Sequence, residues 1–191
     1  MENGATAVVW RRMGYMLTPQ LDIYMHLADR LANKRVLEVG FGTGSGVLQY
    51  ASKANGVTAI EMDKSAVDFA RKVFPISGID WKYGDITNYD TPERYEAVVM
   101  VEVLEHIPNW EVALQRVHDL LLPGGCLYLS YRNANADLRK NDLHEREWSP
   151  EQATESLGRF FDSVWLYDYT LTKVQNTDTR MTPIVVVARK A

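Results

Sequence analysis

The sequence of 191 residues contains a single cysteine, Cys126, which excludes a disulfide within the chain. No second cysteine or histidine lies near Cys126 at the spacing of a zinc site, so the sequence predicts no metal. No apolar run approaches the roughly 18 residues that a membrane span requires, and the first residues lack the charge order of a secretory signal. We therefore expect a cytoplasmic protein with no membrane span.

Positive charge is also scarce in this chain. The sequence has 21 basic and 25 acidic residues, which gives a net charge of -4. Proteins that bind nucleic acid through its phosphates usually have a basic surface, so no DNA partner is expected. The 46% apolar and 24% charged residues are typical of a globular domain. We predict one domain over residues 1–191, with an N-terminal arm and helix at 1–34 as a candidate lid.

Segments with strand and helix patterns alternate along the chain. The last two predicted strands, residues 163–171 and 182–189, leave no room for a crossover helix between them and should pair antiparallel. The pattern predicts an α/β fold: a doubly wound, mostly parallel seven-stranded sheet with a C-terminal antiparallel strand pair. The other strands are expected at 35–39, 57–61, 79–83, 96–101 and 126–130, and the helices at 19–31, 45–53, 65–74, 110–121 and 150–160.

The segment VLEVGFGTGSG, residues 36–46, places glycines at alternate positions directly after a predicted strand. A phosphate-binding P-loop needs a Gly-Lys-Ser/Thr sequence, but no lysine occurs between Lys34 and Lys53. The dinucleotide pattern GxGxxG lacks its third glycine in every register, which makes a nicotinamide site a poor second choice. A nucleoside ligand without phosphate remains, and S-adenosylmethionine has that shape.

Five features, in order along the chain, resemble the class I S-adenosylmethionine-dependent methyltransferases, most closely the small-molecule branch. They are VLEVGFGTGSG, the carboxylate that ends the second strand, YGDIT (83–87), YEAVVMVEVLEHIPN (95–109) and LLPGGCLYLS (121–130). The resemblance implies a Rossmann-like fold, S-adenosylmethionine as cofactor and methyltransferase activity. In it, Glu38 orients the loop or reaches the methionine ammonium, Glu61 binds the ribose hydroxyls, and Asp85 accepts from the adenine amino group. The other implied cofactor-binding residues are Gly40, Gly42, Gly44, Met62, Ile86, Val101 and Glu102.

The catalytic residue is harder to predict. A sulfonium already activates its methyl group, so the protein mainly aligns the reactants and excludes water. A general base is needed only when the nucleophile must lose a proton. His106 and His144 are the catalytic candidates, and residues 131–133 and 144–146 are expected on the acceptor side. A structural role is the alternative for each of them.

The acceptor is expected to be a small molecule. The Asn/Asp-Pro-Pro-Tyr/Phe run of DNA amino-methyltransferases is absent, and Cys126 does not follow a proline as a catalytic thiolate of cytosine methylation would. A protein or RNA methyltransferase is an alternative, and it predicts a basic or open groove around Arg11, Arg12, Arg132 and Arg146. A further alternative is a non-catalytic S-adenosylmethionine-binding partner protein, or a cofactor-degrading enzyme on the same scaffold. The pocket is either open or completed by a second subunit of a homodimer.

Overall fold

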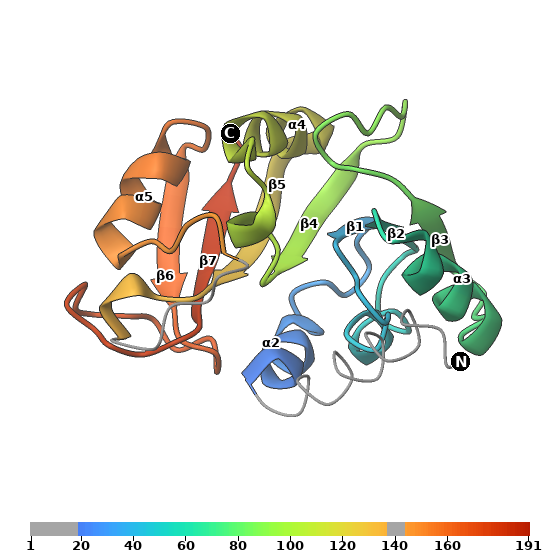
Figure 1. The fold of residues 1–191 in the computed structure, drawn as a ribbon, viewed down its shortest axis with the longest axis horizontal. Helices are drawn as coiled ribbons and strands as arrows, with labels where there is room; N and C mark the ends of the chain where they lie inside the picture. Colours follow the sequence, from blue (N-terminus) through green and yellow to red (C-terminus); the bar gives the residue numbers. More distant parts are fainter. Residues whose placement is uncertain (1–18, 137–143) are drawn as a thin grey trace, which may run out of the picture.

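The computed structural model describes residues 19–136 and 144–191, which share one seven-stranded sheet (Figure 1). The strand order is β3-β2-β1-β4-β5-β7-β6. Neighbouring strands from β3 to β5 pair in parallel, whereas β7 is antiparallel to both β5 and β6. The bounds are β1 Val36–Val39, β2 Val57–Glu61, β3 Ile79–Tyr83, β4 Tyr95–Val101, β5 Leu121–Tyr131, β6 Ser163–Tyr167 and β7 Ile184–Arg189. The predicted α/β fold with its antiparallel C-terminal pair is confirmed.

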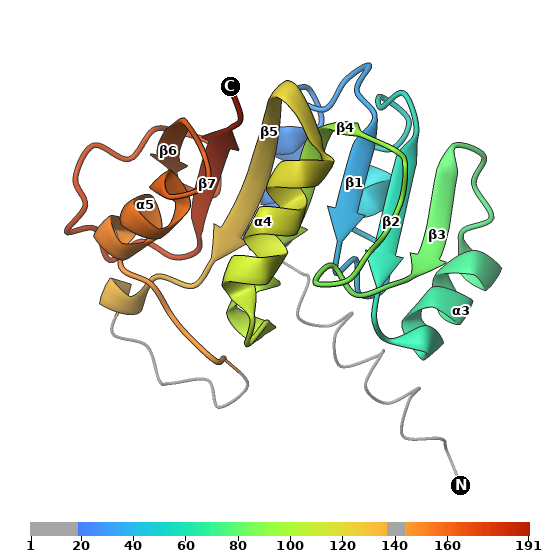
Figure 2. The same ribbon diagram turned by 90° about the horizontal axis from the view of Figure 1, so that it is seen from above.

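Helices cover both faces of the sheet, as Figure 2 shows for α2 and α4 on opposite sides. Because side chains alternate along a strand, successive residues of β1 enter different layers. Val36 lies in the layer covered by α2 and α3, and Leu37 in the layer covered by α4 and α5. The helices are α2 Pro19–Leu27, α3 Lys64–Val73, α4 Trp110–Leu120 and α5 Pro150–Gly158.

The predicted start of α5 is confirmed in atomic detail. The Ser149 side chain accepts a hydrogen bond from the Gln152 amide, and the Gln152 side chain accepts one from the Ser149 amide. This reciprocal capping box satisfies two backbone donors that a helix start otherwise leaves unpaired. Pro150 occupies the first helical position, where a missing amide hydrogen costs nothing.

The predicted helix over residues 45–53 is wrong in its extent. The structure has one 3-10 turn, η1 Val47–Gln49, followed by hydrogen-bonded turns. Bonds to the third and the fourth preceding residue are mixed here, as in Gln49 N to Gly46 O and Ala51 N to Val47 O, so no regular α-helix forms. Tyr50 leaves the helical backbone conformation, and its hydroxyl is bonded to Glu38.

The predicted arm and lid at residues 1–34 falls partly outside the described residues, since the structure describes this segment from Pro19 onward. Within residues 19–34, Ile23, Leu27 and Leu31 are fully buried against the sheet, so this part belongs to the core. The lid stays a prediction for residues 1–18. None of the helices in the described ranges combines the length and apolarity needed to cross a membrane.

Candidate functional site at the carboxyl ends of the strands

The glycine-rich turn follows β1 at the carboxyl end of the sheet. Gly40, Gly42 and Gly44 all have left-handed backbone conformations, with φ of 71°, 56° and 85°, which residues with a Cβ adopt at a cost. A Cβ on Gly40 would lie 2.6 Å from Val103 Cγ2, and one on Gly44 would lie 2.9 Å from Trp81 Cη2. A Cβ on Gly42 would meet no atom within 4 Å. Packing within the protein therefore explains two glycines, and Gly42 is the one that faces open space.

Glu61 fixes this turn from the end of β2. The residue is 7% exposed, Oε2 accepts from the Gly42 amide at 2.9 Å, and Oε1 accepts from the Asp63 amide at 3.0 Å. Asp63 in turn caps α3 through a bond from the Ser65 amide. Each carboxylate oxygen can accept a further hydrogen bond, so Glu61 can brace the turn and still bind hydroxyl groups of a ligand.

Large side chains are left open beside Glu61. Met62 is 68% exposed at the end of β2, and Tyr83 is 64% exposed at the end of β3. Ile86 is buried, and Asp85 Oδ1 accepts from both the amide and the hydroxyl of Thr87. An exposed apolar pair beside carboxylates suits a flat heteroaromatic ring with polar edges. Tyr83 was not among the predicted site residues, although its position at a strand end, two residues before Asp85, was an available signal.

Glu38 is fully buried and serves the protein's own tyrosines. Its Oε1 accepts from Tyr24 of α2 at 2.6 Å, and its Oε2 accepts from Tyr50 at 2.8 Å. Burial raises the pKa of Glu38 to about 8, although the two tyrosine hydrogen bonds act in the opposite direction. This geometry favours the first of the two predicted roles, orientation of the loop, because it ties β1 to α2 and to the turn after η1.

The end of β4 is joined to β5 through Glu102. Val101 is buried, and Glu102 has a left-handed backbone with φ of 55°, an uncommon conformation for a residue with a side chain. The Glu102 amide donates to Ser130 Oγ at 3.1 Å, and that hydroxyl donates back to Glu102 Oε1 at 2.9 Å. Burial raises the pKa of the Glu102 carboxyl, while Ser130 and Arg132 lower it. The strained backbone and the serine contact together direct this segment toward the glycine turn.

The structure brings the two predicted catalytic histidines together. His106 ends η2 (Leu104–His106), shortly after β4, and His144 lies far along the chain. Their ring centroids are nevertheless 4.9 Å apart, with an angle of 79° between the ring planes. His144 Nδ1 is 3.1 Å from Glu147 Oε1, and Arg132 Nε is 3.3 Å from the same oxygen. Burial lowers the pKa of His144 more than Glu147 raises it, which favours its neutral form.

Glu105 lies beside this histidine pair and was not among the predicted site residues. It is 3% exposed, and burial raises the pKa of its carboxyl well above the ordinary value. The neighbouring charges of Glu102 and Glu147 raise it further, against the effect of its own backbone amide. Its position three residues after Glu102 and next to His106 was the available signal in the sequence.

Two other predicted acceptor-side residues, Asn133 and Arg146, donate hydrogen bonds to backbone carbonyls of other segments. Arg146 donates to the carbonyls of Ile107 at 2.6 Å and Pro108 at 3.0 Å, and its guanidinium lies 5.5 Å from the ring centre of Trp110. The buried Asn133 side chain donates to the carbonyls of Thr179 and Met181. Of the four arginines of the predicted basic groove, Arg132 lies against Glu147, Arg146 is bonded to backbone, and Arg11 and Arg12 lie outside the described residues.

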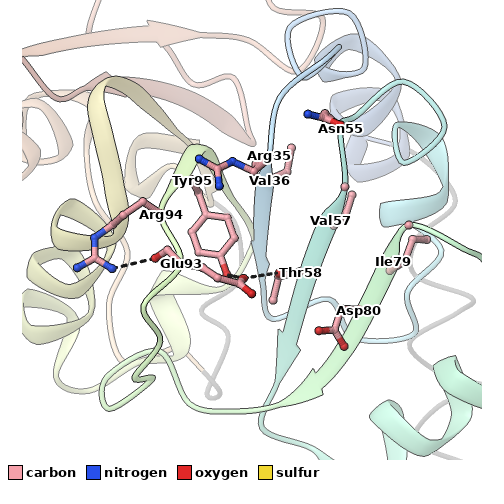
Figure 3. Close-up of a pocket in the computed structure, with 12 residues that line it drawn as sticks. Arg35, Val36, Asn55, Val57, Thr58, Ile79, Asp80, Glu93, Arg94 and Tyr95 are labelled. Carbon is pink, nitrogen blue, oxygen red and sulfur yellow. Dashed lines mark hydrogen bonds between the residues drawn. The ribbon is translucent and has the colours of Figure 1, made fainter.

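A cavity of about 430 Å³ lies at the opposite, amino-terminal ends of β1 to β4 (Figure 3). Among its lining residues, Glu93 accepts hydrogen bonds from Tyr95 at 2.8 Å and Thr58 at 3.4 Å. Ligands of doubly wound sheets bind at the carboxyl ends of the strands. This cavity is therefore not the candidate site.

The fold and the glycine turn define a nucleoside-binding protein of the Rossmann-like class. A family model described as a methyltransferase domain matches residues 10–169, and the chain belongs to this family. The predicted family, that of the class I S-adenosylmethionine-dependent methyltransferases, is thereby confirmed.

Two curated methyltransferases are similar in sequence to part of this chain. The chain is 31% identical over 120 residues to a ubiquinone biosynthesis O-methyltransferase of Aeromonas salmonicida, covering 61% of this chain and 50% of the relative. It is 28% identical over 116 residues to (S)-coclaurine N-methyltransferase of Papaver somniferum, covering 58% and 33%. The matches thus span half or less of these relatives' length.

A solved structure shows the same fold over most of both chains. The N-methyltransferase NodS of Bradyrhizobium japonicum, in complex with S-adenosyl-L-homocysteine, superposes with a TM-score of 0.67 at 18% identity. The superposition covers 90% of this chain and 85% of NodS.

Proposed function

We propose that this protein transfers a methyl group from S-adenosylmethionine to a small-molecule acceptor. The observation that carries the proposal is the turn at Gly42, whose open, left-handed backbone is fixed by the Glu61 carboxylate. Bare backbone beside a carboxylate suits a nucleoside that carries ribose hydroxyls and no phosphate.

The residues around this turn fit such a cofactor. Glu61 has acceptor capacity left for the ribose hydroxyls, and the exposed Met62 and Tyr83 offer apolar surface for adenine. Asp85 would accept from the adenine amino group, and the Ile86 amide would donate to the ring. The backbone at Val101 and Glu102 would meet the methionine portion, while Glu38 holds β1 in place from inside the core.

When bound, S-adenosylmethionine supplies an activated methyl group. The chain then has to hold the acceptor in line with that methyl group and keep water away. For an acceptor that must lose a proton, His144 is the better base of the histidine pair, since burial favours its neutral form. His106 is more exposed than His144, and its ring packs against that of His144.

A small acceptor is favoured over RNA or protein by the arginines. The two described arginines of the predicted basic groove are bonded to Glu147 and to backbone carbonyls, so they offer little charge to a polyanion. The relatives named for ubiquinone biosynthesis and coclaurine support the same choice. A second subunit that completes the pocket and a cytoplasmic location stay predictions.

The proposal is tested first by calorimetric titration with S-adenosylmethionine, S-adenosylhomocysteine and NAD. We expect the two sulfur compounds to bind and NAD not to bind. Glu61→Ala should weaken binding by about 1.5–3 kcal/mol, the scale of hydrogen bonds to a charged group. Glu96→Ala is the matched control, because Glu96 also accepts from a backbone amide, that of Arg35, but at the opposite end of the sheet.

Three results separate the alternatives. Unchanged affinity in a folded Glu61→Ala variant would refute the ribose assignment. Binding without formation of S-adenosylhomocysteine from any of a panel of phenols, amines and carboxylic acids would favour the non-catalytic partner protein. Methylation of RNA or protein in preference to that panel would favour the macromolecular alternative.

A further inference from the structure

Three potential metal ligands from distant parts of the chain converge at the end of β4. Glu105 and His106 belong to η2, and His144 comes from the segment before α5. Each residue offers one ligand atom, and these three atoms all lie within 4.8 Å of one another. Metal–ligand distances of about 2.0–2.2 Å place two ligands of one ion at most about 4.4 Å apart. Small side-chain rotations would therefore bring the three ligand atoms around one cation.

Glu105 is the member of this group that most needs a partner. It is 3% exposed, and neither of its carboxylate oxygens accepts a hydrogen bond from another residue in the described ranges 19–136 and 144–191. Buried polar groups are nearly always hydrogen-bonded, and a buried carboxylate without a partner is costly. The orphaned carboxylate faces the cluster that contains the two imidazoles, so a cation there would remove this cost.

The surrounding charges favour a cation over an anion. The charged side chains that act on Glu105 are Glu102 and Glu147, and both are acidic. Arg132, the nearby base, lies 3.3 Å from Glu147. The cluster therefore places three acidic side chains next to two imidazoles, a setting that suits a bound cation.

Glu147 also orients one of the two imidazoles. Its Oε1 is 3.1 Å from His144 Nδ1, so donation from Nδ1 leaves the lone pair on Nε2 of His144. A carboxylate behind a ligating histidine is the usual outer partner in metal sites, where it fixes the tautomer and the ring orientation.

The backbone holds the two halves of the cluster in register. The Glu145 amide donates to the Glu105 carbonyl at 2.8 Å, directly beside His144. Arg146 adds bonds to the carbonyls of Ile107 and Pro108, which follow His106. These contacts fix the segment of His144 on the segment of Glu105 and His106 before any ligand arrives, as a preorganised site requires.

We propose that Glu105, His106 and His144 bind one divalent transition-metal ion, of the kind represented by Zn²⁺ or Co²⁺. Two imidazoles and one carboxylate suit such an ion better than Mg²⁺ or Ca²⁺, which prefer oxygen ligands alone. Three protein ligands leave coordination positions open for water or another small ligand. The sequence predicted no metal, because the ligands come from separate segments that only folding brings together. The site goes beyond the proposed methyl transfer and does not depend on it. An ion bound to His144 Nε2 would occupy the lone pair that accepts a proton, so the role of His144 as base applies to the metal-free protein.

The test is a Co²⁺ titration followed by the visible absorption of the bound ion, on full-length protein with any affinity tag removed and after treatment with a chelator. We expect one equivalent to bind, Zn²⁺ to displace it, and excess Mg²⁺ to leave it bound. Glu105→Gln and His144→Gln should each weaken binding at least about tenfold, and Glu147→Gln by about tenfold to a hundredfold.

Two controls separate the site from adventitious binding. Glu145→Gln removes an exposed carboxylate next to His144, and His26→Gln removes an exposed histidine on α2; both variants should bind Co²⁺ like the parent. Zn²⁺ should raise the thermal unfolding temperature of the parent and of both controls, but not that of Glu105→Gln. This readout also shows that Glu105→Gln is folded.

The proposal is overturned if the parent binds no stoichiometric metal, or if Glu105→Gln and His144→Gln bind as tightly as the parent. Neither measurement uses S-adenosylmethionine, so failure here leaves the proposed methyl transfer standing, and failure of cofactor binding leaves the metal site standing.

Discussion

The buried carboxylate of Glu38 makes the stability of this protein depend on pH in a specific way. Its ordinary pKa of 4.5 is raised to about 8 in the folded protein, with burial as the largest cause. Because the folded-state pKa lies above the unfolded one, the contribution of Glu38 is fully present below about pH 4.5 and is lost as the pH rises to about 8. Glu38→Gln removes this titration. The amide can still accept from one tyrosine hydroxyl and donate to the other.

The size of the effect follows from the two pKa values. Each unit of difference corresponds to about 1.4 kcal/mol, and between pH 6 and pH 8 the unfolded state loses almost no further protons while the folded state begins to ionise. Integration of the proton difference over this range gives a loss of about 2 kcal/mol from Glu38 alone. The free energy of unfolding of the parent should therefore fall by about 2 kcal/mol more than that of Glu38→Gln over the same interval.

Urea denaturation followed by circular dichroism, at half-unit steps from pH 6 to pH 8, measures how the free energy of unfolding of each protein changes with pH. Glu102 and Glu105 also have raised pKa values, but they are present in both proteins and cancel in the difference. Glu155→Gln, which changes an exposed carboxylate on α5, should follow the parent. Parallel curves for the parent and Glu38→Gln would show that Glu38 keeps its proton, or loses it, in both states alike, and would refute the reasoning.

Three further predictions concern the turn and the helix start. Gly40→Ala should lower the free energy of unfolding by about 1–3 kcal/mol, since its Cβ would overlap Val103 at a left-handed position, as chemical denaturation would show. The Cβ of Gly42→Ala would meet no atom within 4 Å, so backbone strain should lower the free energy of unfolding by only about 1 kcal/mol. Its larger effect should be weaker binding in a titration with S-adenosylmethionine. Equal stability and equal binding of the two variants would contradict this distinction. Ser149→Ala should cost about 1 kcal/mol through loss of the capping box, whereas Ser149→Thr should keep most of the stability, and thermal unfolding of the two variants checks this.

The α/β architecture could be predicted from the sequence, because the patterns that indicate its strands, turns and helix starts involve only neighbouring residues. Alternating apolar segments, the glycine turn after Val39 and the capping box at Ser149 each depend on neighbouring residues, and each was found where predicted. The antiparallel pairing of β6 and β7 was predicted from the lack of a crossover helix between them, and it is confirmed. The helix expected at 45–53 failed because Tyr50 leaves the helical backbone where it bonds to the distant Glu38, which no local pattern shows.

Roles within the site were decided by tertiary structure. The glycine pattern could not show that Gly40 and Gly44 are required by Val103 and Trp81, leaving Gly42 as the open position, because those contacts cross between separate segments. In the same way, the chain order gives no sign that Glu105 is buried without a partner beside His106 and His144. Spacing along a strand or helix is fixed by local backbone geometry, whereas the partner of a buried charge is fixed only when the ends of β4 and β5 fold together.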